Sequence, residues 1–110
     1  MPHVRIEHSG SDADMSALCE AVFEALSGHD AIPHPETLKI RSCRCEAHRI
    51  GTLPDSFAHA RLELLPGRAD GVKTELAQLI LRTMRAHLPT VGSLSVDVAD
   101  LSPSYVKDLL

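Results

Sequence analysis

The spacing of hydrophobic residues changes along this chain in a fixed order, and that order constrains the fold more than any other feature. Residues 3–8 alternate between apolar and polar side chains, which is the pattern of a β-strand. A helical stripe of apolar residues follows, with a capping-type start at Ser11 and Asp14 and a stop at Gly28. Residues 37–45 return to strand character after a proline-containing connection. The first half of the chain therefore predicts strand, helix, strand.

The second half repeats that order after a break rich in glycine and proline. Residues 57–65 alternate as a strand, residues 72–87 carry a helical stripe, and residues 94–99 alternate again before a tail that starts at Leu101. The strands at 37–45 and 57–65 are expected to pair as a hairpin. One face of the strand at 57–65 is predicted to be apolar, made by Ala58, Ala60, Leu62 and Leu64.

The complete order, β-α-β-β-α-β, predicts an α+β fold in two layers. Right-handed crossovers would make each strand-helix-strand pair parallel and place both helices on one face of a four-stranded mixed sheet. The other face would stay uncovered, where Ile40, Leu62, Leu64 and the apolar tail offer surface for association. At 110 residues the chain is expected to form one domain, residues 1–110, that associates with further copies of itself.

Pro2 is the main catalytic candidate, because removal of Met1 would convert it into a free secondary amine. An α-amino group titrates near pH ~7.7 to 8.0, close to the range best suited to proton transfer at neutral pH. Burial and neighbouring cations would hold the pKa of such an amine down, since both disfavour its charged form. A retained Met1 would leave an amide nitrogen without basicity.

Composition excludes several classes of function. The net charge is -4 with acids and bases interspersed, so nothing indicates a nucleic-acid partner, and no apolar run is long enough for a membrane span. No leader-like segment precedes the first strand, and an odd number of cysteines favours a reducing compartment. We expect a cytoplasmic protein without nucleic-acid or membrane partners.

The sequence resembles the tautomerase superfamily and, within it, the 5-carboxymethyl-2-hydroxymuconate isomerases. The similarity rests on segments in a matching order along nearly the whole chain: Pro2 to Glu7, Ile40-Arg41-Ser42, Phe57-Ala58-His59 through Gly67-Arg68, and Leu94 through Leu101-Ser102-Pro103.

The resemblance implies a homotrimer in which Pro2 shuttles a proton during keto-enol tautomerisation of unsaturated 2-hydroxy or 2-oxo acids. It also implies that Arg41 and Arg68 bind the carboxylates of a small-molecule substrate, and that no cofactor takes part. Arginine suits this role because its planar fork binds carboxylates with two hydrogen bonds and its charge stabilises a dienolate. Substrate identity carries over less well, because the segment Cys43-Arg44-Cys45-Glu46-Ala47-His48 replaces a tryptophan-bearing segment of the family.

Two further groups of residues have side chains suited to metal binding or proton transfer. Cys43, Cys45 and His48 have ligand types that suit zinc, but a second ligand pair is lacking and free thiols are favoured over a metal. His3 and His59 are the histidines that neighbouring strands could bring toward Pro2. Phosphate loops, dinucleotide fingerprints and nucleophile elbows are absent from the sequence.

Other functions remain open on the same scaffold. Relatives with a terminal proline perform hydration, dehalogenation or decarboxylation, in which a carboxylate such as Glu7 or Asp97 would activate water. A non-catalytic trimer that binds a partner or a small acid is a further alternative. A ferredoxin-like ligand-binding module would have the same order of elements.

Overall fold

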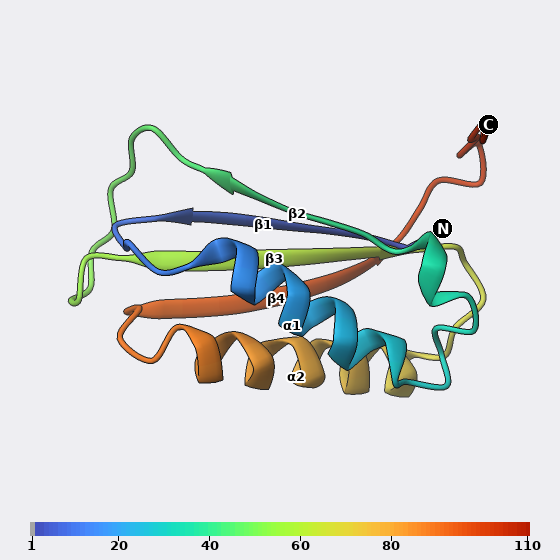
Figure 1. Cartoon of the computed structure of the whole chain (residues 1–110), viewed down its shortest axis with the longest axis horizontal. Helices are drawn as coiled ribbons and strands as arrows, with labels where there is room; N and C mark the ends of the chain where they lie inside the picture. Colours follow the sequence, from blue (N-terminus) through green and yellow to red (C-terminus); the bar gives the residue numbers. More distant parts are fainter. Residues whose placement is uncertain (1) are drawn as a thin grey trace.

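The computed structural model describes residues 2–110, and Met1, whose removal the catalytic interpretation of Pro2 requires, lies outside the described residues. A four-stranded mixed sheet is covered on one face by two helices, as Figure 1 shows. This arrangement confirms the predicted two-layer α+β fold. Among the described residues, no helix combines the length and apolar character needed to cross a membrane.

The observed elements follow the predicted order, with small shifts at their ends. They are β1 (His3–Ser9), α1 (Met15–Ser27), a short 3-10 turn (Pro35–Thr37), β2 (Lys39–Arg44), β3 (Phe57–Leu64), α2 (Asp70–His87) and β4 (Ser93–Asp100). Strand β2 begins later than expected because Thr37 belongs to the turn, where its backbone N-H donates to the carbonyl of His34 at 3.0 Å.

Helix α1 begins and ends where its capping residues predict. The carboxylate of Asp14 accepts a hydrogen bond from the backbone N-H of Ala17 at 3.0 Å, which satisfies one of the free donors of the first turn. Gly28 is the C-cap, and its N-H donates to Glu24 O at 3.3 Å. Both ends of this helix were therefore predictable from local residue types.

Strand order corrects one prediction. The order is β2-β1-β3-β4, so β1 lies between the two strands that were expected to form a hairpin. Strand β1 pairs with β2 in parallel and with β3 in the antiparallel sense, and β4 pairs with β3 in parallel. The connection over residues 45–56 crosses the end of β1 instead of making a tight turn. Each β-α-β unit keeps its two strands adjacent, which distinguishes the sheet from the split β-α-β arrangement of ferredoxin-like folds.

The hydrophobic core fills the space between the sheet and the two helices. Its fully buried members include Val4, Ile6, Leu18, Val22, Leu26, Ala60, Leu62, Leu64, Leu76, Ile80 and Met84. Leu62 and Leu64 thus face the helices, and the prediction that they lie on the uncovered face is wrong. Side-chain alternation explains this result, because a strand places successive residues on opposite faces. The alternate apolar side chains of β3 all pack into the core between the sheet and the helices.

Candidate active site

A cavity of about 140 Å³ lies at the end of the sheet where β1 begins. Apolar side chains form much of its wall, together with one arginine and one histidine. The lining residues are Pro2, Ile32, Pro33, His34, Thr37, Leu65 and Arg68. Pro2 and Arg68, two residues singled out from the sequence, therefore share one cavity although they are far apart in the chain.

Pro2 is held at this position by the start of the sheet. The residue is buried, and its carbonyl oxygen accepts a hydrogen bond from the backbone N-H of Lys39 at 3.1 Å. Because Lys39 is the first residue of β2, the parallel pairing of β1 with β2 extends to Pro2 itself. Pro2 is thus fixed against the sheet, beside the connection that precedes β2.

Arg68 joins the connection before β2 to the segment after β3, and both segments contribute residues to the cavity wall. Its Nε and Nη2 donate to the carbonyl oxygen of Ala31 at 3.1 and 2.8 Å, and its Nη1 donates to that of Leu65 at 3.3 Å. Gly67 precedes it with φ +123°, a backbone conformation that favours glycine. A guanidinium has five N-H groups, so one remains on each terminal nitrogen for an anionic ligand.

The connection between α1 and β2 contributes cavity residues that sequence reasoning missed. Ile32, Pro33, His34 and Thr37 all line the cavity, whereas the sequence identified this stretch only as a connection. Its two prolines were a usable signal, because they fix the chain immediately before a strand that must pair beside Pro2. The exposed ring of His34 lies with Nδ1 3.6 Å from the carboxylate of Glu36.

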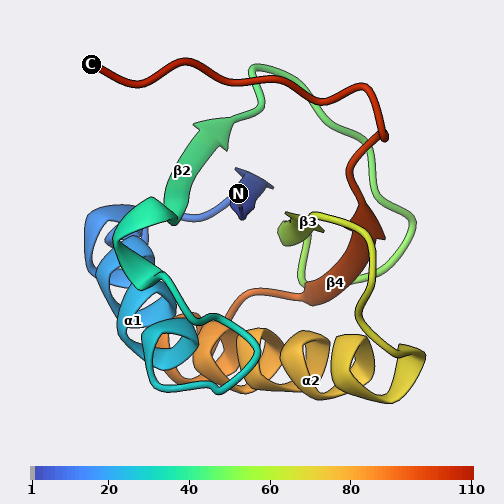
Figure 2. The same cartoon turned by 90° about the vertical axis from the view of Figure 1, so that its right-hand side faces the viewer.

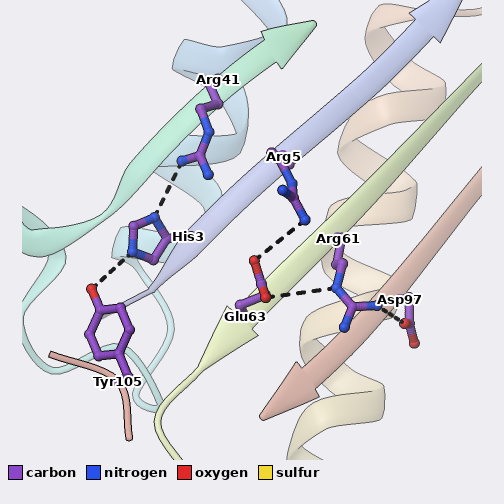
Figure 3. Close-up of polar contacts among 7 residues, drawn as sticks. All are labelled: His3, Arg5, Arg41, Arg61, Glu63, Asp97 and Tyr105. Carbon is purple, nitrogen blue, oxygen red and sulfur yellow. Dashed lines mark hydrogen bonds and ion pairs between the residues drawn. The ribbon is translucent and has the colours of Figure 1, made fainter. Parts of the chain in front are cut away.

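Arg41 lies on the uncovered face of the sheet and is absent from the cavity lining. Figure 3 shows its guanidinium pointing to His3, with Nη1 3.3 Å from the Nδ1 of that ring. The opposite ring nitrogen, Nε2, is 3.0 Å from the hydroxyl of Tyr105, and the two rings meet edge to face. Burial, followed by the nearby charges of Arg41 and Lys39, lowers the pKa of His3. The positively charged guanidinium of Arg41 and the neutral imidazole of His3 thus lie side by side.

Charged side chains occupy the middle of the uncovered face, contrary to the expected apolar surface. Arg61 contacts Asp97 at 3.0 Å and Glu63 at 3.9 Å, while Arg5 lies 3.8 Å from Glu63 (Figure 3). Register places Arg41, Arg5 and Arg61 opposite one another on three neighbouring strands. The carboxylates between them offset the repulsion that like charges have at such positions.

The other candidates from the sequence lie apart from the cavity. Glu7 and Asp97 occupy strands β1 and β4, and neither lines the cavity. His3 and His59 extend from the uncovered face, where Nδ1 of His59 lies 2.7 Å from the hydroxyl of Ser95. His48 contacts the carboxylate of Asp55 at 2.9 Å.

The cysteines give no sign of a metal centre. Cys43 is exposed, Cys45 and Cys19 are half-buried, and all are free thiols. Within residues 2–110, no three histidine, cysteine or acidic side chains gather closely enough to hold an ion.

Comparison with known families decides what kind of protein carries this cavity. The sequence model of the 5-carboxymethyl-2-hydroxymuconate isomerase family matches residues 2–105, which is nearly the whole chain. The chain belongs to that family. It is accordingly an isomerase of the tautomerase superfamily, as its resemblance to these proteins predicted.

Solved structures of similar proteins share the fold. A 5-carboxymethyl-2-hydroxymuconate isomerase from Deinococcus radiodurans R1 superposes with a TM-score of 0.84 at 20% identity, covering 98% of this chain and 90% of that chain. A 5-carboxymethyl-2-hydroxymuconate delta-isomerase gives 0.83 at 21% identity, with coverages of 99% and 88%. A fused 4-OT symmetric trimer gives 0.74 at 16% identity, with coverages of 94% and 89%. No curated protein sequence matches the chain.

Proposed function

We propose that this protein is a cofactor-independent keto-enol tautomerase of unsaturated 2-hydroxy and 2-oxo acids that carry carboxylates, with Pro2 as the proton shuttle. One observation carries the proposal: Pro2 is buried beside a cavity that Arg68 also lines, in a chain whose family is isomerases. The apolar wall supports it further, because exclusion of water strengthens electrostatic interactions inside a small cavity.

The proposed reaction needs a base, a cation and no cofactor. With Met1 removed, the neutral Pro2 amine would take the hydroxyl proton of an enol acid, and charge would spread over the resulting dienolate. The same proton would then return to carbon, which completes the isomerisation with the electrons balanced. Arg68 would hold the carboxylate of the substrate through its two remaining N-H groups. A positive charge such as this guanidinium, placed near the 2-oxygen, stabilises the dienolate.

Arg41 enters the proposal through a neighbouring subunit. Its side chain lies on the uncovered face and not in the cavity of its own chain, so contact with substrate requires a second copy. A homotrimer supplies such a copy, and two structures similar to this chain are named as symmetric trimers. In that assembly, each site would combine Pro2 and Arg68 of one subunit with Arg41 of the next.

The alternative chemistries draw no support from the cavity. Hydration, dehalogenation or decarboxylation would need a carboxylate to activate water, and neither Glu7 nor Asp97 is among the cavity residues. Asp97 is engaged with Arg61 at 3.0 Å. Proton transfer is assigned to Pro2, which does line the cavity.

The test is turnover by protein whose intact mass shows that Met1 is gone. Phenylenolpyruvate and 2-hydroxymuconate both change their ultraviolet absorption when they ketonise, so initial rates are directly measurable. Processed protein should accelerate both reactions, whereas protein that retains Met1 should not. Equal rates with and without Met1 would remove Pro2 from the mechanism.

A further inference from the structure

We propose that His3 is a positioning residue for Arg41, held in turn by Tyr105 of the C-terminal tail. The proposal rests on the proposed function, in which Arg41 binds a carboxylate of the substrate. His3 lies between the other two side chains, 3.3 Å from the guanidinium of Arg41 and 3.0 Å from the hydroxyl of Tyr105 (Figure 3). These contacts make a continuous line from the tail to the arginine.

The chemistry of the partners fixes the proton on His3. A guanidinium only donates hydrogen bonds, so Nδ1 of His3 must accept from Arg41 through its lone pair. The neutral ring then carries its hydrogen on Nε2, which donates to the hydroxyl oxygen of Tyr105. The hydroxyl of Tyr105 can accept this hydrogen bond, so its contact with His3 is compatible with the tautomer that Arg41 requires.

Charges around the ring keep it in this state. Arg41 and Lys39 face His3 from β2, Glu63 faces it from β3, and Tyr105 covers it from the tail. Burial and the two cations lower the pKa of His3, and Glu63 opposes them. Protonation would place an N-H against the guanidinium and remove the only acceptor that the ring offers to Arg41.

The tail supplies the remaining constraint. Figure 2 shows the chain after β4 running across the open side of the sheet and past β2. Tyr105 is half-buried, whereas Val106, Leu109 and Leu110 beyond it are exposed. Contact between Tyr105 and His3 thus ties this segment to β1 and limits the orientations of the imidazole. A fixed imidazole reduces the freedom that Arg41 would lose on binding a carboxylate.

Two substitutions of His3 separate its contacts. His3→Asn keeps an acceptor near the position of Nδ1, while His3→Gln keeps a donor near Nε2 and loses the acceptor for Arg41. With 2-hydroxymuconate, His3→Gln should raise KM about 3- to 10-fold with little change in kcat, as expected for one lost hydrogen bond in ground-state binding. His3→Asn should raise KM less than His3→Gln, because it keeps the acceptor for Arg41 but loses the contact with Tyr105. His59→Gln, on the same face but bonded to Ser95, is the matched control and should have no effect.

A double-substitution cycle separates positioning from general damage to the fold. His3→Gln should raise KM in the wild-type background and have no further effect in an Arg41→Ala background, because the group that it positions is gone. Independent, additive effects of the two changes would overturn the proposal. So would wild-type KM in His3→Gln when Arg41→Ala raises it.

Failure of the proposed function has a different signature. If processed wild-type protein ketonises none of the enol acids, the proposed function is wrong. Nitrogen-15 NMR of the His3 imidazole then tests the contact between His3 and Arg41 without any measurement of activity. Wild-type His3 should show the Nε2-H tautomer, and its pKa should rise in Arg41→Ala because a nearby cation has been removed. An unchanged titration of His3 in that variant would overturn the positioning proposal.

Discussion

Pro2 and Arg41 lie on different sides of the same sheet. Pro2 lines the cavity together with Ile32 of the core, whereas the guanidinium of Arg41 lies against His3 on the uncovered face. Side-chain alternation enforces this division, since Arg41 is in register with Arg5, which faces away from the helices. A site that uses both residues must therefore be shared between subunits.

Mixing two impaired variants tests that sharing. Pro2→Ala and Arg41→Ala should each have low activity with 2-hydroxymuconate, and mixed trimers should regain part of it, because about one site in three of a mixed trimer would then combine intact residues from two subunits. Rates measured after subunit exchange check this expectation. No recovery in trimers shown by mass spectrometry to be mixed would place both residues in one subunit's site.

Replacement of Pro2 should affect chemistry more than folding. Positioned proton transfer typically supplies ~10²- to 10⁴-fold, so Pro2→Ala, which leaves a more mobile primary amine, should lose about that much in kcat. The rising limb of the pH profile of kcat/KM should shift in this variant, because a different amine now titrates. Circular dichroism provides the folding control, and a wild-type rate in Pro2→Ala would exclude this amine as the base.

Arg68 should contribute to both binding and stability. Its hydrogen bonds to Ala31 and Leu65 hold the cavity wall together, and each bond to a charged donor is worth about 1.5 to 3 kcal/mol before solvent screening at this half-buried site. Arg68→Ala should therefore lower the melting temperature as well as kcat/KM, the latter roughly 10- to 100-fold. Arg82→Ala, at an exposed position on α2, is the control for loss of a surface arginine. Reduced activity with unchanged stability would contradict the structural part of this role.

Assembly can be measured directly. We expect light scattering to report three subunits, because the proposed site needs a neighbour and the charged uncovered face is the side without helices. Charge reversal at Asp97, which contacts Arg61 at 3.0 Å, should weaken the assembly if this face is buried in it. A monodisperse monomer at micromolar concentration would remove the basis for a shared site.

Stability should fall as the pH drops below 6.5, the ordinary pKa of histidine. Burial, and then the charge of Arg44, lowers the pKa of His8 in the folded state. The unfolded chain therefore binds a proton that the folded chain resists, and the free energy of unfolding decreases through this range. Nδ1 of His8 is also buried without a hydrogen-bond partner.

His8→Leu should flatten this pH dependence and raise the free energy of unfolding at pH 5 by about 1 kcal/mol, since an unsatisfied polar atom is removed. Urea titrations at pH 5 and pH 8 measure both effects. His87→Gln, at an exposed position of α2, is the control. An equally steep pH dependence in His8→Leu would assign the acid sensitivity to other groups, beginning with His3.

Local patterns predicted the elements well, but pairing between strands depended on information that they lack. Asp14 and Gly28 marked the ends of α1 correctly because caps act within one helical turn. The hairpin between β2 and β3 was wrong because a polar, glycine-containing connection fits a hairpin and a crossover equally well. Only the hydrogen bonds of β1 to both strands decide between them.

The cavity was predictable in part. Pro2 was identified from its place after Met1 and Arg68 through resemblance to a family, and both line one cavity. His34 and Leu65 were missed because their role depends on how two connections meet in space, which residue spacing does not encode. The uncovered face was misjudged for a related reason: Leu62 and Leu64 are apolar, and the period of two does not say which side of a strand meets the helices.

The contact between His3 and Tyr105 joins positions 102 residues apart. The amino-terminal strand is made first during synthesis, yet it lies in the middle of the sheet and its imidazole cannot meet its partner until residue 105 has been translated. A protein truncated before Tyr105 would retain every strand and helix of the fold while leaving His3 open to solvent. The environment of His3, which directly follows the proposed base Pro2, thus depends on a residue translated after every strand and helix of the fold.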